Sequence, residues 1–465
     1  MRHGVVPGDR IAVQVDKSVN AILLYVACLR LGAVFVPINV ANTPNEVEYL
    51  LRDCAAKLAV VRPADQALLE PRTTPAGIPV ESLGADSDGS LAALVQLLEV
   101  SEVPRTGDAD ALAAIVYTSG TTGRPKGAML SRANLASNAV VLAEVWHFTN
   151  QDVLLHVLPL FHVHGLFAAI NTVLASGSSL LMLDTFDAAS ALKYLPQVSV
   201  FMGVPTHYTR LLQQTALNHE MTAGVRLFVS GSAPLLAETH REFLLRTGHT
   251  ILERYGMTET LMNTSNPYYG VRKPGSVGVP LPGTAVRVAN ASTGALEREV
   301  DLIGALEVAG PNVFAGYWHD PEKTRSEFTA DGWFKTGDLG RIDCDGYVHI
   351  VGRAKDVVIS GGYNVYPKEV EMELDALPGV LESAVFGVPH PDLGEGVTAV
   401  LVPVGNTAFS ETEIIRALRA RLSRYKVPKR VLLVDELPRN SMGKVQKNAL
   451  RSSYGSLYAA ETGDK

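Results

Sequence analysis

The chain has 465 residues, of which 47% are hydrophobic and 19% are charged, and its formal net charge at pH 7 is −7. This length predicts two or more domains, and the composition excludes a disordered protein. The negative charge argues against a nucleic-acid-binding surface, so we expect no nucleic acid partner. Anionic substrates would have to be met by local basic groups.

Short apolar runs alternate with helix-periodic segments along most of the first half of the chain. Ser18 is a candidate N-cap and Gly32 a natural stop for the first helix. The alternation predicts a parallel sheet covered by helices, whereas residues 62–108 show weak periodicity and are interpreted as peripheral helices and loops. Strands are predicted at 11–15, 33–38, 58–61, 153–158, 179–183, 198–203 and 225–230, and helices at 18–31 and 44–54.

The pattern changes twice in the second half. Residues 275–350 form short strands broken by Gly and Asp, as in an antiparallel or barrel-like unit. Beyond a boundary near 352–356, helices are predicted at 368–377 and 411–422 and strands at 383–388 and 398–403. We therefore expect an α/β fold with a large N-terminal domain, residues 1–352, built of α/β subdomains plus a β-barrel-like unit. A small, mobile α+β C-terminal domain, residues 353–465, follows it.

The cysteines and the first ten residues indicate in which cellular compartment the protein is expected. Cys28, Cys54 and Cys344 form no C-x-x-C pair, so neither structural disulfides nor a zinc site are expected. No apolar run approaches the roughly 18 residues that span a bilayer, and residues 1–10 lack the apolar core of a signal peptide. We expect a cytoplasmic protein without a membrane span.

A run rich in glycines and hydroxyl groups follows the apolar segment 113–117. Glycines let the backbone approach a phosphate, hydroxyls add donors, and a lysine adds a mobile positive charge. The run lacks Walker spacing and alone could be an ordinary surface loop, but its position after a strand favours a polyphosphate-binding loop. It comprises Thr118, Ser119, Gly120, Thr121, Thr122, Gly123, Arg124, Pro125, Lys126 and Gly127.

Three further motifs follow at residues 253–260 (ERYGMTET), 332–340 (GWFKTGDLG) and 437–447 (LPRNSMGKVQK). Singly, they could be a helix end with a surface acid, a capped β-turn and a solvated Gly-Lys pair. Together with the glycine-rich run, in this order, they resemble the adenylate-forming superfamily of acyl-CoA synthetases, peptide-synthetase adenylation domains and luciferases. The resemblance covers nearly the whole chain and implies the adenylate-forming enzyme fold.

The resemblance implies a binding site for ATP and Mg2+. Tyr255 would stack on adenine, Thr258 would bond the α-phosphate, and Glu259 would ligate Mg2+, which prefers few carboxylates plus phosphate oxygens. Asp338 would accept the ribose hydroxyls, and Arg353 would reach the ribose and phosphate. Residues 118–123 and Lys126 would hold the phosphates, and the other nucleotide-site positions are Gly231, Ser232, Ala233, Glu253, Arg254 and Gly256.

The resemblance also implies two half-reactions at one site. A carboxylate attacks the α-phosphate of ATP to give an acyl-adenylate and pyrophosphate, and coenzyme A then takes the acyl group. Lys444 would bridge the carboxylate and the nucleotide in the first step. Lys355 matches the hinge about which the C-terminal domain rotates. Gly361 and Gly362 would then approach the adenylate and line the pantetheine tunnel.

Other segments concern the acid. Residues 159–167 match the segment that lines the acyl and thiol channel, with His164 as its catalytic and substrate-facing residue. His162 and His164 are not expected to bind a metal, because on an extended segment their rings would face opposite ways. Ser230 would contact the acyl wall. A dicarboxylate would need a cation for its distal carboxylate, and we expect Arg241 in this role, with Arg210 in reserve, although most helix arginines are simply solvated.

The amino-acid sequence of five segments most resembles that of malonyl-CoA synthetases. These segments are residues 231–236, 239–242, 253–260, 262–266 and 361–369. The expected reaction is ATP-dependent ligation of malonate to coenzyme A, with methylmalonate tolerated in part because one methyl changes pocket fit by only about 1–3 kcal/mol. The alternative is a ligase for another short-chain, fatty or aromatic acid. Luciferase-like chemistry stays open. A peptide-synthetase domain is disfavoured because no carrier domain follows Lys444.

A non-catalytic nucleotide-binding protein is disfavoured because the charged motif residues Lys126, Glu259, Asp338, Arg353 and Lys444 occur together. Relatives usually carry a further segment ahead of residues 4–10, so an early helix and strand of the first subdomain are expected to be missing. We expect a monomer or weak homodimer.

Overall fold

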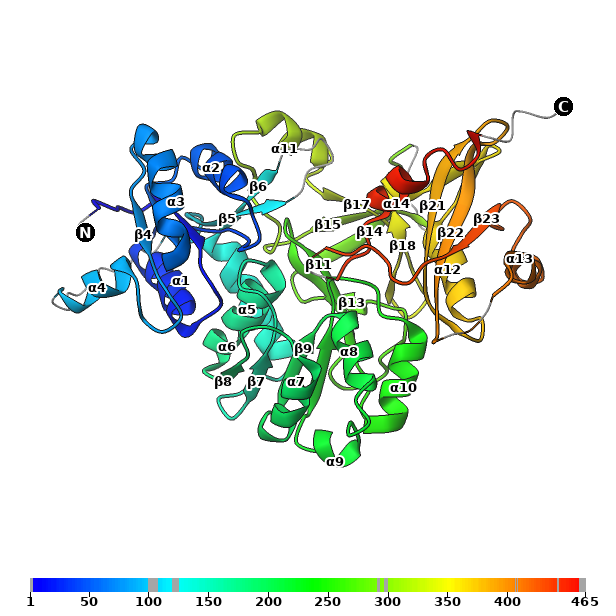
Figure 1. Cartoon of the computed structure of the whole chain (residues 1–465), viewed down its shortest axis with the longest axis horizontal. Coiled ribbons are helices and arrows are strands. Elements are labelled where there is room, and N and C mark those ends of the chain that lie inside the picture. Colours follow the sequence, from blue (N-terminus) through cyan, green and yellow to red (C-terminus); the bar gives the residue numbers. More distant parts are fainter. Residues whose placement is uncertain are drawn as a thin grey trace.

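A computed structural model describes residues 3–98, 108–118, 125–290, 293–296, 300–405, 407, 409–440 and 443–459. The described residues form four sheets, which follow one another along the chain except that the short strand β16 (Gly316–Tyr317) joins the first sheet. In Figure 1 the first sheet lies at the blue end and the second below the centre in green. The C-terminal unit lies at the orange and red end.

The first sheet has seven strands in the order β16-β6-β5-β2-β1-β3-β4. Strands β1 to β5 pair in parallel, whereas β6 and β16 add antiparallel strands at one edge. The strands are β1 (Arg10–Gln14), β2 (Val34–Pro37), β3 (Leu58–Val61), β4 (Val80–Ser82), β5 (Leu112–Thr118), β6 (Lys126–Ser131) and β16 (Gly316–Tyr317).

The caps predicted for the first helix, α1 (Val19–Leu31), are present. The Ser18 side chain accepts a hydrogen bond from the Ala21 N–H, and Gly32 ends the helix with a φ of 80°. The helices predicted within residues 62–108 are present, but the strand β4 is not predicted, because it has only three residues and shows no visible alternation. The other helices here are α2 (Pro44–Asp53), α3 (Pro63–Thr73), η1 (Thr74–Ala76) and α4 (Ser90–Gln96).

The second sheet has the order β13-β12-β11-β10-β9-β7-β8, parallel from β8 to β11 and then antiparallel. Ligands of open α/β sheets bind beyond the carboxyl ends of such strands. Its strands are β7 (Val153–His156), β8 (Ser179–Met182), β9 (Val200–Gly203), β10 (Leu227–Ser230), β11 (Leu252–Met257), β12 (Leu261–Ser265) and β13 (Val279–Pro280). Its helices are α5 (Arg132–Val145), η2 (His164–Ile170), α6 (Asn171–Ser176), α7 (Ala188–Tyr194), η3 (Leu195–Gln197), α8 (Pro205–Leu212), α9 (His219–Thr222) and α10 (Ala237–Thr247).

The third sheet is antiparallel, as predicted for residues 275–350, and has four strands in the order β14-β15-β17-β18. These are β14 (Ala285–Ala289), β15 (Gly304–Ala309), β17 (Phe334–Ile342) and β18 (Val348–Arg353), and α11 (Pro321–Glu327) precedes β17.

The C-terminal unit begins after β18 and the short helix η4 (Ala354–Asp356). The buried apolar clusters of the described residues lie on one side of residues 350–358 or the other, and none of them crosses. The unit contains β19 (Val358–Ser360), β20 (Tyr363–Val365), β21 (Val380–His390), β22 (Gly394–Pro403) and β23 (Arg430–Leu433), with α12 (Pro367–Asp375), α13 (Glu411–Arg419) and α14 (Lys447–Tyr454). Within the described chain, no helix is both long and apolar enough to span a bilayer.

Candidate active site

Tyr255, Asp338 and Arg353 meet where the second and third sheets adjoin. The Tyr255 hydroxyl donates to Asp338 Oδ2 at 2.5 Å, and Arg353 Nε lies 2.6 Å from Asp338 Oδ1. The β17–β18 register places Asp338 directly opposite Arg353, and Asp338 is buried. Burial, and then the Asp338 carboxylate, raise the pKa of Tyr255 well above its ordinary value, so its hydroxyl stays a donor. The predicted ribose residues are therefore brought together.

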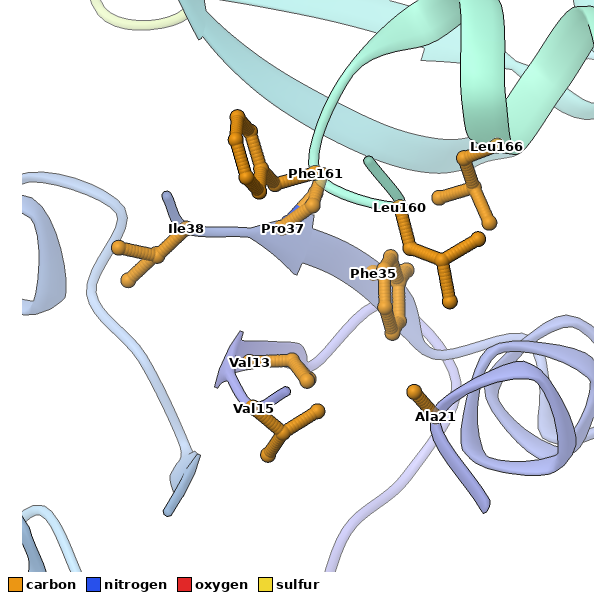
Figure 2. Close-up of a pocket in the computed structure, with 9 residues that line it drawn as sticks. All are labelled: Val13, Val15, Ala21, Phe35, Pro37, Ile38, Leu160, Phe161 and Leu166. Atoms are coloured by element: carbon orange, nitrogen blue, oxygen red, sulfur yellow. The ribbon is translucent and has the colours of Figure 1, made fainter. Parts of the chain in front are cut away.

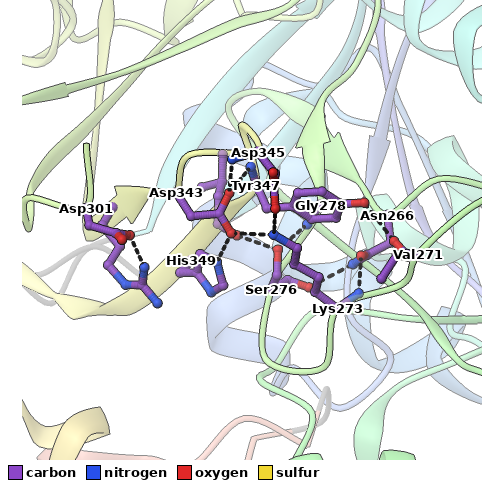
Figure 3. Close-up of polar contacts among 12 residues, drawn as sticks. Asn266, Val271, Lys273, Ser276, Gly278, Asp301, Asp343, Asp345, Tyr347 and His349 are labelled. Carbon is purple, nitrogen blue, oxygen red and sulfur yellow. Dashed lines mark hydrogen bonds and ion pairs between the residues drawn. The ribbon is translucent and has the colours of Figure 1, made fainter. Parts of the chain in front are cut away.

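The hairpin that carries Asp338 and Arg353 is held by a charged cluster at its turn (Figure 3). Lys273 Nζ lies 2.8 Å from Asp343 Oδ2 and 2.7 Å from Asp345 Oδ2, and the His349 ring lies 3.0 Å from Asp343. The Lys273 N–H donates to Asn266 Oδ1 at 3.1 Å, just beyond β12. These bonds tie the β17–β18 turn to the end of β12 in the second sheet. Lys273 lies in none of the motifs.

Glu259 lies in the turn after β11 and is buried. Its carboxylate accepts from the Tyr317 hydroxyl at 2.9 Å, and Lys126 Nζ lies 5.7 Å from the centre of the Tyr317 ring. Tyr317, on β16, thus links the end of the glycine-rich run to the predicted metal ligand, and no motif identifies it. Burial raises the pKa of Glu259, and a cation bound there would lower it again.

The single carboxylate of Glu259 suits Mg2+ better than a metal that takes all of its ligands from the protein. Among the described residues, no group of three or more His, Cys, Asp or Glu side chains could hold a metal. Mg2+ is commonly held by one or two carboxylates plus substrate phosphates, and Glu259 would supply the carboxylate. When bound, the ion would neutralise phosphate charge.

The centre of the glycine-rich run, Ser119, Gly120, Thr121, Thr122 and Gly123, lies outside the described residues. Its two ends are fixed, because Thr118 pairs with Lys126 across β5 and β6. The role of the run stays a prediction.

Lys444 approaches this site from the C-terminal unit. The segment that carries it, drawn in red before α14, runs from that unit toward the centre of the molecule (Figure 1). A Cβ on Gly443 would lie 3.0 Å from Thr206 Oγ1 of α8. Lys444 is exposed as a whole residue, but the protein around its ammonium and the nearby Arg353 lower its pKa, while Asp338 and Asp356 oppose the shift. Lys355, the predicted hinge, acts on the same ammonium.

His164 lies on a helix and not, as expected, on an extended strand. It begins the π-helical segment η2 and is buried. Its Nδ1 lies 3.2 Å from Ser232 Oγ, and its backbone N–H donates to His162 Nδ1 at 3.2 Å. Ser232 has a φ of 72°, which marks a constrained turn after β10. The turn of residues 230–233 therefore contacts His164, the predicted channel residue.

Arg254 is a buried guanidinium beside this turn. A Cβ on Gly231 would lie 2.4 Å from Arg254 Cζ, so only glycine leaves room there. Arg254 Nε and Nη2, Ser230 Oγ and His164 Nε2 are buried and have no hydrogen-bond partner. Burial lowers the pKa of Arg254 to about 9. Unpaired buried donors are rare in native proteins, so this group suits an anionic ligand.

The segment in front of His164 also packs on the first sheet. Figure 2 shows an apolar pocket at this contact. The lining side chains are all apolar, which does not suit a charged acid, so we interpret the pocket as packing space. They are Val13, Val15, Ala21, Phe35, Pro37, Ile38, Leu160, Phe161 and Leu166.

Glu253 and Gly256 flank the adenine candidate Tyr255. Glu253 accepts from the Gly275 N–H at 3.2 Å, and burial raises its pKa to about 8. A Cβ on Gly256 would meet the Leu261 carbonyl oxygen at 1.9 Å. Gly361 and Gly362 instead form the β19–β20 turn, whose Gly361 N–H bonds to Leu393 O within the C-terminal unit.

The structure does not bring Arg241 to the other site residues. Its side chain is 66% exposed and donates to Glu238 at 2.5 Å on the solvent side of α10. The buried side of α10 carries His240 and Phe243 instead. Arg210 is exposed on α8 near His207, whose pKa it helps to lower. The sequence alone does not show which face of α10 packs on the core, so it does not show that Arg241 lies on the solvent side.

Comparison with known proteins identifies the family of the chain. A family model described as AMP-binding enzyme matches residues 1–318, and one described as AMP-binding enzyme C-terminal domain matches residues 369–444. The chain belongs to the AMP-binding enzyme family. The superfamily predicted from the four motifs is thereby confirmed.

Two relatives of this AMP-binding enzyme are informative. A mitochondrial malonate–CoA ligase of Mus musculus, ACSF3, is 37% identical over 480 residues, 95% of this chain and 81% of its own length. The ATP-bound crystal structure of MatB from Rhodopseudomonas palustris is 52% identical, with a TM-score of 0.96 over 98% of this chain and 91% of that one.

Apo MatB from the same organism, at 53% identity and the same coverage, gives a TM-score of 0.85. The arrangement of this AMP-binding enzyme is thus nearer to that of the ATP-bound relative. The predicted fold, a large α/β part with a small C-terminal domain, is confirmed.

Buried histidines should make this AMP-binding enzyme acid-labile. Burial lowers the pKa of His156 and His207 to about 3 and that of His162 to about 4. Nearby cations add to the shift: Lys17 acts on His156, Arg210 and Lys17 act on His207, and Arg254 acts on His162. The unfolded chain therefore takes up protons below pH 6.5 that the folded chain refuses, and stability falls as the pH drops toward 4.

Each such histidine should cost about 1.4 kcal/mol of unfolding free energy per pH unit below 6.5. We expect Tm to fall steeply between pH 7 and pH 5 in thermal scans, and His156→Gln to make the slope shallower. A Tm independent of pH over this range would contradict the neutral state of these rings.

Proposed function

We propose that this enzyme ligates malonate to coenzyme A in two steps, through a malonyl-adenylate. In the first, one malonate carboxylate attacks the α-phosphorus of ATP and displaces pyrophosphate. In the second, the thiol of coenzyme A attacks the acyl carbon, and AMP leaves with the carboxylate oxygen that formed the anhydride. The similarity to the mouse ligase and to MatB supports this reaction.

The nucleotide side of the reaction is assigned to residues that lie together. Asp338, oriented by Tyr255 and Arg353, offers acceptors to the ribose hydroxyls. Lys444 supplies positive charge where charge develops at phosphorus during the first step. Thr258 and Glu259, in the turn after β11, face the phosphates, and Glu259 would hold Mg2+.

The observation that favours malonate is the buried guanidinium of Arg254, whose Nε and Nη2 have no hydrogen-bond partner. A buried cation without a partner is costly, and a carboxylate that pairs with it recovers much of that cost. Arg254 lies beside Gly231, and its charge acts on His164, so the distal carboxylate of malonate would reach it while the other carboxylate reaches ATP. A guanidinium can bind that carboxylate bidentately. We therefore assign binding of the distal carboxylate to Arg254. The sequence pattern predicted Arg241 in this role, with Arg210 in reserve.

The proposal is tested by pyrophosphate release across a panel of acids, with and without coenzyme A. We expect malonate to give the highest kcat/KM, and methylmalonate to be used about 10–200-fold less well. Acetate and propionate should be poor substrates because they leave Arg254 unpaired. A preference for an aromatic or long-chain acid would overturn malonate.

Two further expectations stay predictions. Cytoplasmic location and a monomer or weak homodimer follow from the sequence pattern alone. Sedimentation of the purified protein would decide the oligomeric state.

A further inference from the structure

The lysine assigned to the first step lies on a short hairpin. Arg439 and Val445 form an isolated β-bridge, and the Asn440 N–H donates to the Lys444 carbonyl at 3.0 Å. The Lys444 N–H donates to Asn440 Oδ1 at 2.9 Å. So short a two-stranded hairpin is at best marginally stable on its own, so the direction of the Lys444 side chain depends on other support.

Arg439 supplies that support from two sides. Its Nη1 donates to the Gly443 carbonyl at 2.6 Å, across the hairpin. Its Nη2 pairs with the Glu382 carboxylate on β21, in the sheet of the C-terminal unit. Both side chains are about one-quarter exposed, at 26% and 25%, so solvent weakens the pair less than it would on an open surface.

Gly443, which Arg439 holds, is also a point of contact with the large domain. Its φ is 73°, and a Cβ there would lie 3.0 Å from Thr206 Oγ1. A shift of the Gly443 carbonyl would therefore move Lys444, its neighbour in the chain, relative to Asp338 and Arg353. The Arg439 guanidinium thus joins the hairpin tip to the rigid sheet behind it.

We propose that Arg439 is a positioning residue for Lys444 in the adenylate-forming step. The proposal rests on the proposed function, because it needs Lys444 to act in that step. Arg439 makes no contact with substrate in this role; it fixes where the ammonium of Lys444 lies. The thioester-forming step, which does not use Lys444, should be indifferent to it.

The test compares two half-reactions in Arg439→Ala. Malonate-dependent ATP–pyrophosphate exchange should fall about 100-fold, the effect of a misplacement near 1 Å. Thioester formation from chemically prepared malonyl-adenylate should stay within about twofold of wild type, because positioning of Lys444 is not used there. Arg439→Lys should recover only part of the exchange, because an ammonium cannot span both acceptors.

Arg430→Ala is the matched control. It removes an arginine of the same unit that pairs with Glu411 at 3.0 Å, away from the hairpin, and should change neither half-reaction. Should Arg439→Ala not fold, Glu382→Gln removes the anchor and should lower exchange selectively. Equal loss of both half-reactions, or unchanged exchange, would overturn the proposal. A wild-type enzyme without malonate-dependent exchange would instead count against the proposed function.

Discussion

Lys444→Ala is expected to abolish malonate-dependent ATP–pyrophosphate exchange while sparing acyl transfer from preformed malonyl-adenylate to coenzyme A. The ammonium lies in the field of Arg353 and Asp338, where it offsets the charge that develops as the carboxylate attacks phosphorus. Loss of one preorganised charge of this kind costs about 10²–10³ in rate. The first half-reaction should fall by at least that factor.

Stopped-flow measurement of each half-reaction separates the two steps. Lys426→Ala is a suitable control, because this lysine pairs with Glu369 in the same unit and should affect neither step. Equal loss of both half-reactions in Lys444→Ala would mean that one arrangement serves both steps, and the predicted rotation about Lys355 would be wrong.

Arg254→Met is expected to change which acid the enzyme prefers. A site built to bind a charged group can reject an analogue that lacks the group by about 10⁴-fold, so the malonate preference over propionate should fall by a large part of that factor. Methionine keeps much of the volume and removes an unpaired buried cation. Tm should therefore hold or rise, which separates lost recognition from misfolding.

Arg241→Ala is the matched comparison, because this arginine is 66% exposed and paired with Glu238. It should leave kcat/KM for every acid unchanged, and Arg210→Ala provides the third arm. A selective loss of malonate use in the Arg241 or Arg210 variant, with Arg254→Met unaffected, would move the distal carboxylate to that residue. Equal losses across all acids in Arg254→Met would remove it from recognition.

Much of the fold follows from local patterns in the chain. Helix α1 begins after Ser18 and ends before Gly32, the two predicted caps, because capping depends on neighbours in sequence. The parallel strands β7, β9 and β10 appear as apolar runs because both of their faces are covered. Strand β4 has three residues, too few to show a period, so its place at the sheet edge depends on pairing with β3.

The site residues divide in the same way into those that a local motif identifies and those that only long-range packing brings to the site. Tyr255, Asp338, Arg353 and Lys444 stand in motifs. The structure places the first three in contact, and the roles of all four stay predictions. Tyr317 reaches Glu259 across 58 positions, and no local pattern identifies it. The proposed reassignment from Arg241 to Arg254 has the same origin. Packing between distant elements decides that Arg254 on β11 is buried and that Arg241 on α10 is exposed.

The measurement that tests the central claim most directly follows oxygen from the acid into the nucleotide. The enzyme is given ATP, coenzyme A and malonate labelled with ¹⁸O in both carboxylates, and the phosphorus products are analysed by mass spectrometry. A mixed anhydride with the α-phosphate predicts AMP that carries one labelled oxygen, with unlabelled pyrophosphate. Unlabelled AMP, or label in phosphate released with ADP, would contradict an acyl-adenylate and with it the assigned roles of Lys444 and Asp338.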